Sequence, residues 1–453
     1  QGWMERTSDD ALLSLALLSW ARSCNRTIQA FKVGPDYLDP QLLSMASGRP
    51  CRNLDLNLCG DAWVKGAFHS YGGSCELSLV EGVMGLFDGI GSSSRGSTAA
   101  VAHWLGLPVI LVVDAGGQAA SLGALVRGFR DHDPQLNLAG VVLNRVSSQR
   151  HQDLLADVLD SMGMPLLGCL PRSDLLSLPS RHLGLAPAHE LANAKQQCAA
   201  WASLAEEHLD MENLAPLLKA PEPGPNPLGD RIANHSGELP VAVASDAAFH
   251  FRYAETAELL ERNGMPIVGW SPLSDEPIPE QARGLILPGG FPEQHAAQLS
   301  SCNRSLRSLR QFVAQRPVYA ECGGMLLLGQ QLTDLQGHRH AMAGVLPFTA
   351  QRGALQVGYR QLQARRESPV LARHQQLVGH EFHRWDLTAK RPPSDGSVLW
   401  DIEGWNVQRR AEGWGDQTLH ASWVHLHWAS SSTICCRWRA ALEAAATPLP
   451  TDS

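Results

Sequence analysis

Residues 317–326 have the sequence Pro-Val-Tyr-Ala-Glu-Cys-Gly-Gly-Met-Leu. The apolar start predicts a short buried strand, and the apolar run after the glycines predicts a helix. Cys322 then lies at a sharp strand-to-helix turn, where hydrolytic enzymes place a nucleophile. The glycines permit the tight turn, and the helix N-terminus lowers the pKa of a thiol placed there. A buried structural cysteine is the alternative, but the Glu-Cys-Gly-Gly corner directly after a strand favours the nucleophile.

The composition is that of an ordinary globular protein. The chain has 453 residues, of which 44% are hydrophobic and 18% charged, and its length suits two or three domains. The net charge of −8 gives no basic signal for nucleic acid. The ten cysteines form no CxxC pair, so neither a zinc site nor a disulfide framework is predicted, and a reducing cytoplasm is expected. No apolar run reaches the roughly 18 residues of a membrane span.

Charged side chains follow two predicted strands in the first part of the chain. The strand predicted at residues 27–33 carries Lys32 and leads into a loop with two aspartates, of which Asp36 is the first. The strand predicted at residues 77–80 ends at Glu81, among glycines. Sheets of α/β proteins bind ligands at such strand ends, and carboxylates there suit Mg²⁺ and phosphate chemistry. Turn-forming residues are the alternative for either loop alone, and the two loops together favour a site.

Short apolar strands alternate with helical segments in both halves of the chain. Further strands are predicted at residues 108–113, 138–143, 165–170, 241–244, 266–270 and 285–287. This alternation predicts βαβ units, with parallel sheets covered on both faces. Residues 220–230 contain four prolines and two glycines and predict an extended linker. The predicted parts are residues 1–190, a helical and proline-rich linker at 191–239, and a second α/β domain at 240–453.

Eight motifs occur in a fixed order along the chain. They are FKVGPDYLDP (31–40), ASGRP (46–50), NLD (53–55), EGVMGLFDG (81–89), RHLGL (181–185), PGGFPE (288–293), AECGG (320–324) and GHEFH (379–383). In this order they resemble the cobyrinic acid a,c-diamide synthase family, which comprises glutamine amidotransferases of corrinoid biosynthesis. The resemblance runs from about Leu12 to about Trp428, and the number of long motifs makes it specific.

The resemblance implies a P-loop domain of the dethiobiotin-synthetase type followed by a class I glutamine amidotransferase domain. Cys322 would attack the glutamine amide and release ammonia. ATP would phosphorylate the a and c carboxylates of cobyrinic or hydrogenobyrinic acid, and ammonia would displace the phosphate. The implied partners are these small molecules, namely the corrinoid, glutamine and ATP, with no nucleic acid and no membrane. A cytoplasmic homodimer is expected.

The resemblance also implies roles for individual residues. The residues that would hold ATP and Mg²⁺ in the first domain are Lys32, Asp36, Asp55 and Glu81. The carboxylates of Asp55 and Glu81 suit Mg²⁺, and the Lys32 ammonium suits phosphate charge. Gly289 and Gly290 would supply backbone donors for the oxyanion.

Two histidines are candidates for the base of Cys322. The family segment Ala-Ser-Tyr-x-His matches residues 421–425, which favours His425. Many class I amidotransferases place an orienting glutamate two residues later, and here that position is His427. Either Cys322 and His425 work as a dyad, or another group orients the ring. His427 is the alternative base.

The N-terminal segment departs from the family pattern. Members normally open with a strand and a Gly-x-Gly-Lys-Thr-Thr phosphate loop, but the aligned residues 7–12 read Thr-Ser-Asp-Asp-Ala-Leu. They contain no glycine or lysine, and their two aspartates would repel phosphate. Because the chain also starts at Gln1, the N-terminus is expected to be truncated, altered by a sequence error or inactivated. The chain as given is expected to bind ATP weakly or not at all.

Two alternative functions stay open. The same chemistry could act on another tetrapyrrole such as nickel sirohydrochlorin. The altered phosphate loop also allows a relic that binds a tetrapyrrole without amidating it. A panel of substrates distinguishes these alternatives.

Overall fold

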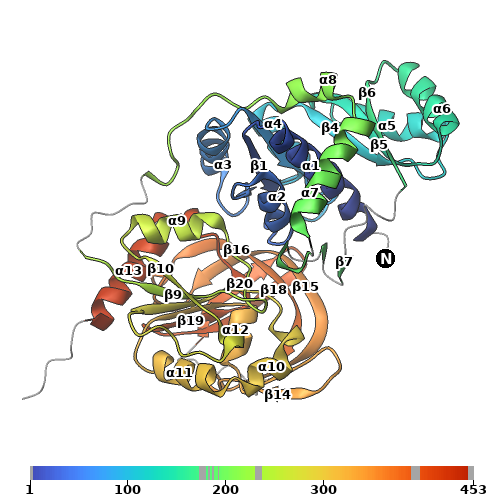
Figure 1. The fold of residues 1–453 in the computed structure, drawn as a ribbon. Helices are drawn as coiled ribbons and strands as arrows, with labels where there is room; N and C mark the ends of the chain where they lie inside the picture. Colours follow the sequence, from blue (N-terminus) through green and yellow to red (C-terminus); the bar gives the residue numbers. More distant parts are fainter. Residues whose placement is uncertain are drawn as a thin grey trace, which may run out of the picture. The chain divides into compact units, whose positions relative to one another are not determined.

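The computed structural model describes residues 4–172, 180–181, 184–185, 188–191, 193–229, 237–388 and 398–446. The chain divides into two compact units, residues 1–56 with 60–227, and residues 57–59 with 228–453 (Figure 1). Both units are α/β and contain parallel strands, which confirms the predicted fold class. The predicted RHLGL motif lies partly outside the described residues. Within the described residues, no helix is both long and apolar enough to cross a membrane.

The first unit has two separate three-stranded parallel sheets, in the strand orders β2-β1-β3 and β4-β5-β6. The strands are β1 (Ile28–Val33), β2 (Arg52–Leu54), β3 (Leu77–Glu81), β4 (Val109–Asp114), β5 (Leu138–Val146) and β6 (Leu166–Pro171). Five of them match the predicted strands closely, because each is a short, largely buried apolar run. The short strand β2 was not predicted.

Helices surround these sheets. They are α1 (Met4–Ser23), α2 (Asp39–Ser47), α3 (Asp61–Ala67), α4 (Thr98–Leu105), α5 (Ser121–His132), α6 (Gln149–Asp160), α7 (Ala194–His208) and α8 (Met211–Leu214). Their ends follow local chemistry. The Ser97 hydroxyl caps α4 by accepting a hydrogen bond from Ala100 N, and Gly106 ends α4 in the left-handed conformation. Helix α1 contributes Leu15 and Leu18 to the core, and both are fully buried.

The first part of the proline-rich segment packs on the first unit. Ala220 N donates to the Glu76 carbonyl, and Gly224 N donates to the His69 carbonyl. The boundary between the two units falls between Pro227 and Leu228, so helices α7 and α8 belong to the first unit.

The second unit is built on a 12-stranded mixed sheet. Its order is β10-β9-β11-β12-β19-β18-β17-β15-β13-β14, with β16 and β20 attached through β15. The first five strands are parallel: β10 (Ile267–Trp270), β9 (Val241–Ala244), β11 (Gly284–Leu287), β12 (Val318–Glu321) and β19 (Leu419–Ser422). In Figure 1, helices α9 (Ala254–Arg262) and α13 (Ser432–Ala446) lie on one side of this part, and α10 (Ala296–Ser301) and α11 (Asn303–Val313) lie on the other.

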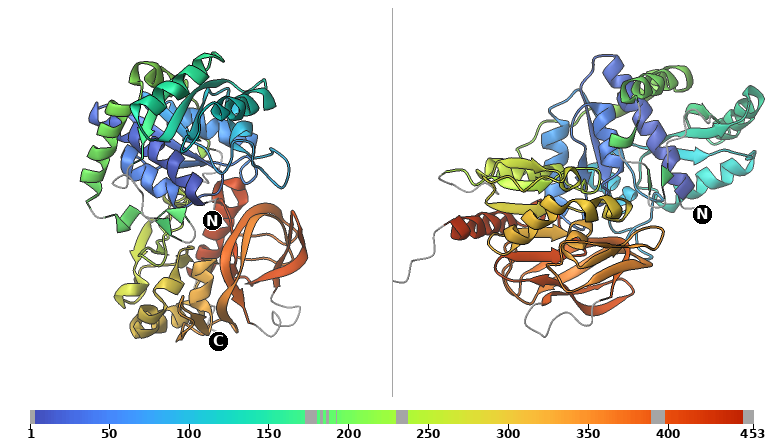
Figure 2. Two further views of the ribbon diagram at one scale, coloured as in Figure 1. Left: turned by 90° about the vertical axis from the view of Figure 1, so that its right-hand side faces the viewer. Right: turned by 60° about the horizontal axis from the view of Figure 1, so that its bottom comes forward.

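A largely antiparallel extension continues the sheet, and it is seen from two further directions in Figure 2. Its strands are β13 (Gln331–Thr333), β14 (Arg339–Ala341), β15 (Thr349–Ala364), β16 (Gln376–Leu387), β17 (Val398–Gly404), β18 (Val407–Gly415) and β20 (Val424–His425). The sequence did not predict these strands. The exposure of β15 does not alternate cleanly along the strand, and a bulge between Arg352 and Gln356 breaks its register with β16.

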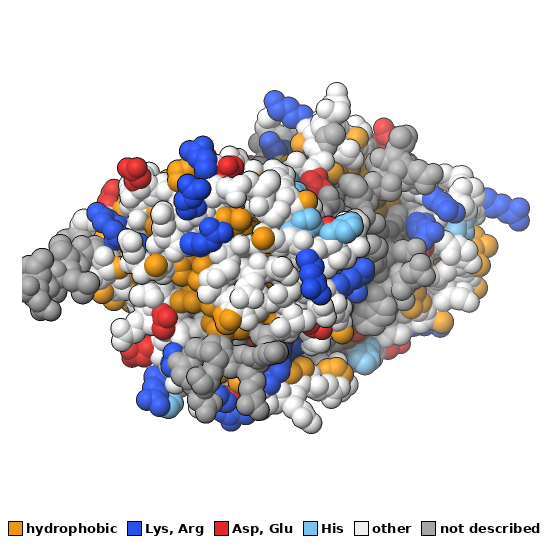
Figure 3. Space-filling view, turned by 90° about the horizontal axis from the view of Figure 1, so that it is seen from below, with side chains coloured by type: hydrophobic (Ala, Val, Ile, Leu, Met, Phe, Trp, Pro, Cys, Tyr) orange, Lys and Arg blue, Asp and Glu red, His pale blue; other side chains and the backbone are white. Residues whose placement is uncertain are grey.

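Charged side chains on the face drawn in Figure 3 are interspersed. Lys and Arg side chains and Asp and Glu side chains both lie scattered over it, and no continuous basic stripe is seen on that face.

Candidate active sites

Cys322 lies at a strained corner between β12 and α12 (Gly323–Leu328). Its backbone has φ 45° and ψ −108°, a conformation that residues other than glycine rarely adopt. The Cys322 N–H donates to the Ser422 carbonyl at 2.7 Å, which helps to hold this conformation. The side chain is nearly buried, with 6% exposure, and its Sγ lies 3.6 Å from the Phe382 carbonyl. The predicted strand-turn-helix geometry is therefore present.

Tight backbone packing explains the glycines around this corner. A side chain at Gly324 would collide with the carbonyl oxygen of Leu287, at the end of β11. A Cβ on Gly323 would lie 3.0 Å from Gly290 N, and one on Gly289 would lie 2.6 Å from His425 Cε1. The corner therefore packs directly against the Gly289–Gly290 segment that the sequence associates with the oxyanion.

His425 lies on strand β20 and interacts with Cys322. The ring is buried, and its Nδ1 lies 3.4 Å from the Glu321 Oε2. Burial lowers the pKa of His425, but the interactions with Cys322 and Glu321 outweigh it and raise that pKa to about 10. The imidazolium is thus stabilised next to the sulfur, as a thiolate–imidazolium pair requires.

Glu321 is a site residue to which the sequence assigned no role. Its Oε1 accepts hydrogen bonds from the Tyr319 hydroxyl and, at 2.9 Å, from the backbone N–H of Leu426. These bonds leave Oε2 on the side of His425. The sequence feature that could have indicated its role is an acidic residue at the buried end of a strand, directly before the nucleophile.

His427 belongs to a separate pair. Its Nδ1 accepts a hydrogen bond from Ala429 N, and its Nε2 lies 3.6 Å from the Glu255 Oε2. The Tyr253 ring packs on it, with ring centroids 4.3 Å apart. The Nδ1 of His427 is therefore bonded to Ala429 N and its Nε2 faces Glu255, which favours His425 as the partner of Cys322.

A second cluster of charges lies at the carboxyl ends of β1 and β3 in the first unit. Lys32 Nζ lies 2.7 Å from Asp39 Oδ2 and 2.8 Å from Glu81 Oε1, and all three groups are buried. Lys32 Nζ also donates to the Gly82 carbonyl. The Asp36 carboxylate accepts hydrogen bonds from the backbone N–H groups of Leu38, which precedes α2, and Asp39, which begins it. Asp39 lies in the FKVGPDYLDP motif, but the sequence assigned it no role.

The three carboxylates of this cluster outnumber its single lysine. Burial lowers the pKa of Lys32, but the carboxylates outweigh it and raise that pKa well above its usual value. Burial and then the neighbouring Asp39 raise the pKa of Asp36 to about 7, and burial raises the pKa of Glu81. The cluster can therefore gain a proton or a cation near neutral pH.

The donor set fits Mg²⁺ only in part. The Glu81 Oε2 is buried without a hydrogen-bond partner, and a cation would satisfy such an oxygen. Asp55 lies at the end of β2, with β1 between it and the strand of Glu81. In the described part of the chain, no three His, Cys, Asp or Glu side chains are grouped to hold a metal. Mg²⁺ could be held here by one or two carboxylates, which suits an ion shared with phosphates and water.

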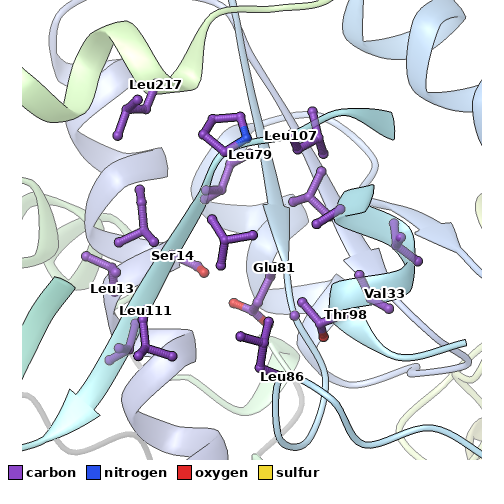
Figure 4. Close-up of a pocket in the computed structure, with 18 of the residues that line it drawn as sticks. Leu13, Ser14, Val33, Leu79, Glu81, Leu86, Thr98, Leu107, Leu111 and Leu217 are labelled. Atoms are coloured by element: carbon purple, nitrogen blue, oxygen red, sulfur yellow. The ribbon is translucent and has the colours of Figure 1, made fainter. Parts of the chain in front are cut away.

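The aligned phosphate-loop position is helical in this structure, because residues 7–12 lie within α1. A cavity of about 570 Å³ lies between β3 and β4, the strands where the two sheets of the first unit end (Figure 4). Its walls are mainly apolar and include Leu13 and Leu111, whereas Ser14, Glu81 and Thr98 supply polar groups. The cavity thus lies where the parallel strands of the first unit are interrupted, between β3 and β4.

Comparisons with known proteins agree with both units. A CobB/CobQ-like glutamine amidotransferase domain matches residues 240–433, and an AAA domain matches residues 62–180. The chain is 40% identical over 438 residues to the cobyrinate a,c-diamide synthase of Synechocystis sp., covering 95% of this chain and 90% of the relative. It is 39% identical to the enzyme of the same name from Synechococcus sp., covering 91% of each chain. It is 38% identical to the hydrogenobyrinate a,c-diamide synthase of Streptomyces coelicolor, covering 91% of this chain and 90% of the relative.

Proposed function

The chain belongs to the cobyrinate and hydrogenobyrinate a,c-diamide synthase family, and we propose that it converts the a and c carboxylates of a corrin precursor into amides with ammonia from glutamine. It is a carbon–nitrogen ligase of cobalamin biosynthesis with a glutamine amidotransferase domain. The observation that carries the proposal is Cys322 on a strained corner, next to the buried His425 with which it interacts, inside the matched amidotransferase domain.

The second unit releases ammonia. The Cys322 thiolate attacks the side-chain amide carbon of glutamine, and His425 gives the proton it took from the thiol to the departing nitrogen. Backbone N–H groups of Gly289 and Gly290 stabilise the oxyanion, a contribution of about 3–4 kcal/mol in comparable sites. Water then hydrolyses the glutamyl thioester and restores the thiol.

The first unit activates the acceptor. A carboxylate is a poor acyl donor because oxide is a poor leaving group, and phosphorylation by ATP provides a better one. The AAA domain match supports nucleotide binding in this unit. Lys32 offsets phosphate charge, whereas Asp36, Asp55 and Glu81 place carboxylates at the same edge of the sheet. Bound Mg²⁺ would neutralise phosphate charge at these carboxylates.

A panel of substrates tests the reaction. Cobyrinic acid, hydrogenobyrinic acid and nickel sirohydrochlorin are each incubated with ATP and either glutamine or ammonia, and product masses are measured. The enzyme is the chain as given and, in parallel, the chain with a Gly-Lys-Thr-Thr loop restored at residues 7–12. We expect the restored chain to form first a monoamide and then a diamide of one of the two corrin acids. Amidation of the nickel tetrapyrrole alone, or tetrapyrrole binding without any change in mass, would contradict the proposal.

A further inference from the structure

We propose that Glu321 is the positioning residue for His425, so that the nucleophile's own strand supplies the carboxylate that orients the base. The residue two places beyond the base, which is His427, does not do so. The proposal rests on the proposed glutaminase function and adds a third member to its Cys322–His425 pair. The triad would then run from Glu321 through His425 to Cys322.

The contacts of Glu321 hold its carboxylate in one place. The Tyr319 hydroxyl and the Leu426 N–H both donate to Oε1, and Leu426 directly follows His425 in the chain. The hydrogen bond from Leu426 therefore also fixes the backbone next to His425. The other carboxylate oxygen of Glu321, Oε2, lies 3.4 Å from the Nδ1 of that histidine. A carboxylate on Nδ1 places the ring proton on that nitrogen and leaves Nε2 for the thiol proton.

This arrangement determines how protons move when Cys322 attacks the glutamine amide. The Cys322 S–H bond breaks, its proton passes to His425, and the sulfur keeps the electron pair for the attack on the amide carbon. Glu321 stabilises the imidazolium without accepting the proton itself. The proton then leaves with ammonia, so no further reactant is required.

Other groups near His425 do not supply this charge. His380 of β16 is paired in register with His425 on β20, and burial lowers its pKa to about 3, so it is neutral at physiological pH. The Tyr319 hydroxyl donates to Glu321, and burial followed by that carboxylate raises its pKa well above the usual value. Cys322, Glu321 and His380 interact with His425, and Glu321 is the carboxylate of these three groups.

The test measures how readily Cys322 is alkylated as a function of pH, in the full chain. Iodoacetamide is the probe, and peptide mass mapping separates Cys322 from the other nine cysteines. In Glu321→Gln the imidazolium loses its carboxylate, so the thiolate should form at a higher pH, closer to the ordinary thiol range of about 8.5. We expect the pH at which the alkylation rate increases to shift upward by about one unit or more. At pH values below this increase, the variant should then be alkylated about tenfold more slowly than the wild type.

Matched variants distinguish positioning from burial. Glu255→Gln removes the carboxylate of the neighbouring His427 pair and should leave the alkylation profile of Cys322 unchanged. Glu321→Asp keeps the charge but withdraws it from Nδ1, so its profile should lie between those of the wild type and Glu321→Gln. If circular dichroism shows that Glu321→Gln does not fold, the Glu321→Asp variant tests by itself whether Glu321 positions His425. The proposal is overturned if the folded Glu321 variants have the same profile as the wild type. It is also overturned if Glu255→Gln shifts the profile as much as Glu321→Gln does.

The alkylation readout is independent of amide synthesis. If the chain with the restored phosphate loop forms no corrin amide but the Glu321 variants shift the profile as expected, the proposed function fails and the role of Glu321 stands. If amide forms but the profiles coincide, the role of Glu321 fails and the function stands.

Discussion

Replacement of Cys322 by alanine is expected to abolish glutamine-dependent amidation and ammonia release, with a loss of about ten-thousand-fold or more. The thiolate forms the covalent intermediate, and no other group in the described site can replace a missing sulfur at this corner. Amidation with added ammonia should persist, because ammonia enters after the thioester step. The measurement compares, in the chain with the restored phosphate loop, the rates of amide formation with glutamine and with ammonia as nitrogen source.

Three further variants control this result. His425→Ala should reduce glutamine use in the same direction, whereas His427→Ala should be milder because its ring pairs with Glu255. Cys302→Ala, at another buried cysteine of the same unit, should leave both activities unchanged. Equal loss of activity with both nitrogen sources in Cys322→Ala would show that Cys322 is structural.

Restoring a phosphate loop is expected to strengthen ATP binding by about 100-fold or more. Such a loop wraps several backbone N–H groups and a lysine around the phosphates, whereas residues 7–12 offer neither glycine nor lysine and are helical here. Isothermal titration calorimetry with ATP and Mg²⁺ compares the chain as given with one carrying a Gly-Lys-Thr-Thr loop at this position. A loop with methionine in place of its lysine is the control and should bind with intermediate affinity. Micromolar ATP binding by the chain as given would show that the nucleotide site lies elsewhere.

Local patterns made the active-site corner predictable. An apolar strand, a cysteine, two glycines and an apolar helix follow one another within ten residues, and the chain folds there as that order requires. The strands of the two parallel regions were also predictable, apart from β2 and β19, because strands buried on both faces are continuous apolar runs. The antiparallel strands were missed, since their exposure does not alternate cleanly and the bulge in β15 shifts the register.

Roles that depend on distant contacts could not be predicted. Glu321 gains its role from the backbone of Leu426, 105 residues further along the chain. Asp39 gains its role by folding back onto Lys32, at the start of a helix that packs beside β1. Periodicity along the sequence gives no information about such pairings, because they are made only when separate elements pack together.

The central claim is that nitrogen from the glutamine side chain ends in the corrin amides. The most direct measurement supplies glutamine labelled with heavy nitrogen in its side-chain amide, together with ATP, a corrin acid and the chain with the restored phosphate loop. The corrin product is then analysed by mass spectrometry, with Cys322→Ala as the control. We expect a corrin diamide that carries the label at both new amides, and no labelled product from Cys322→Ala. Glutamine hydrolysis without label in the corrin, or labelled amides formed by Cys322→Ala, would contradict it.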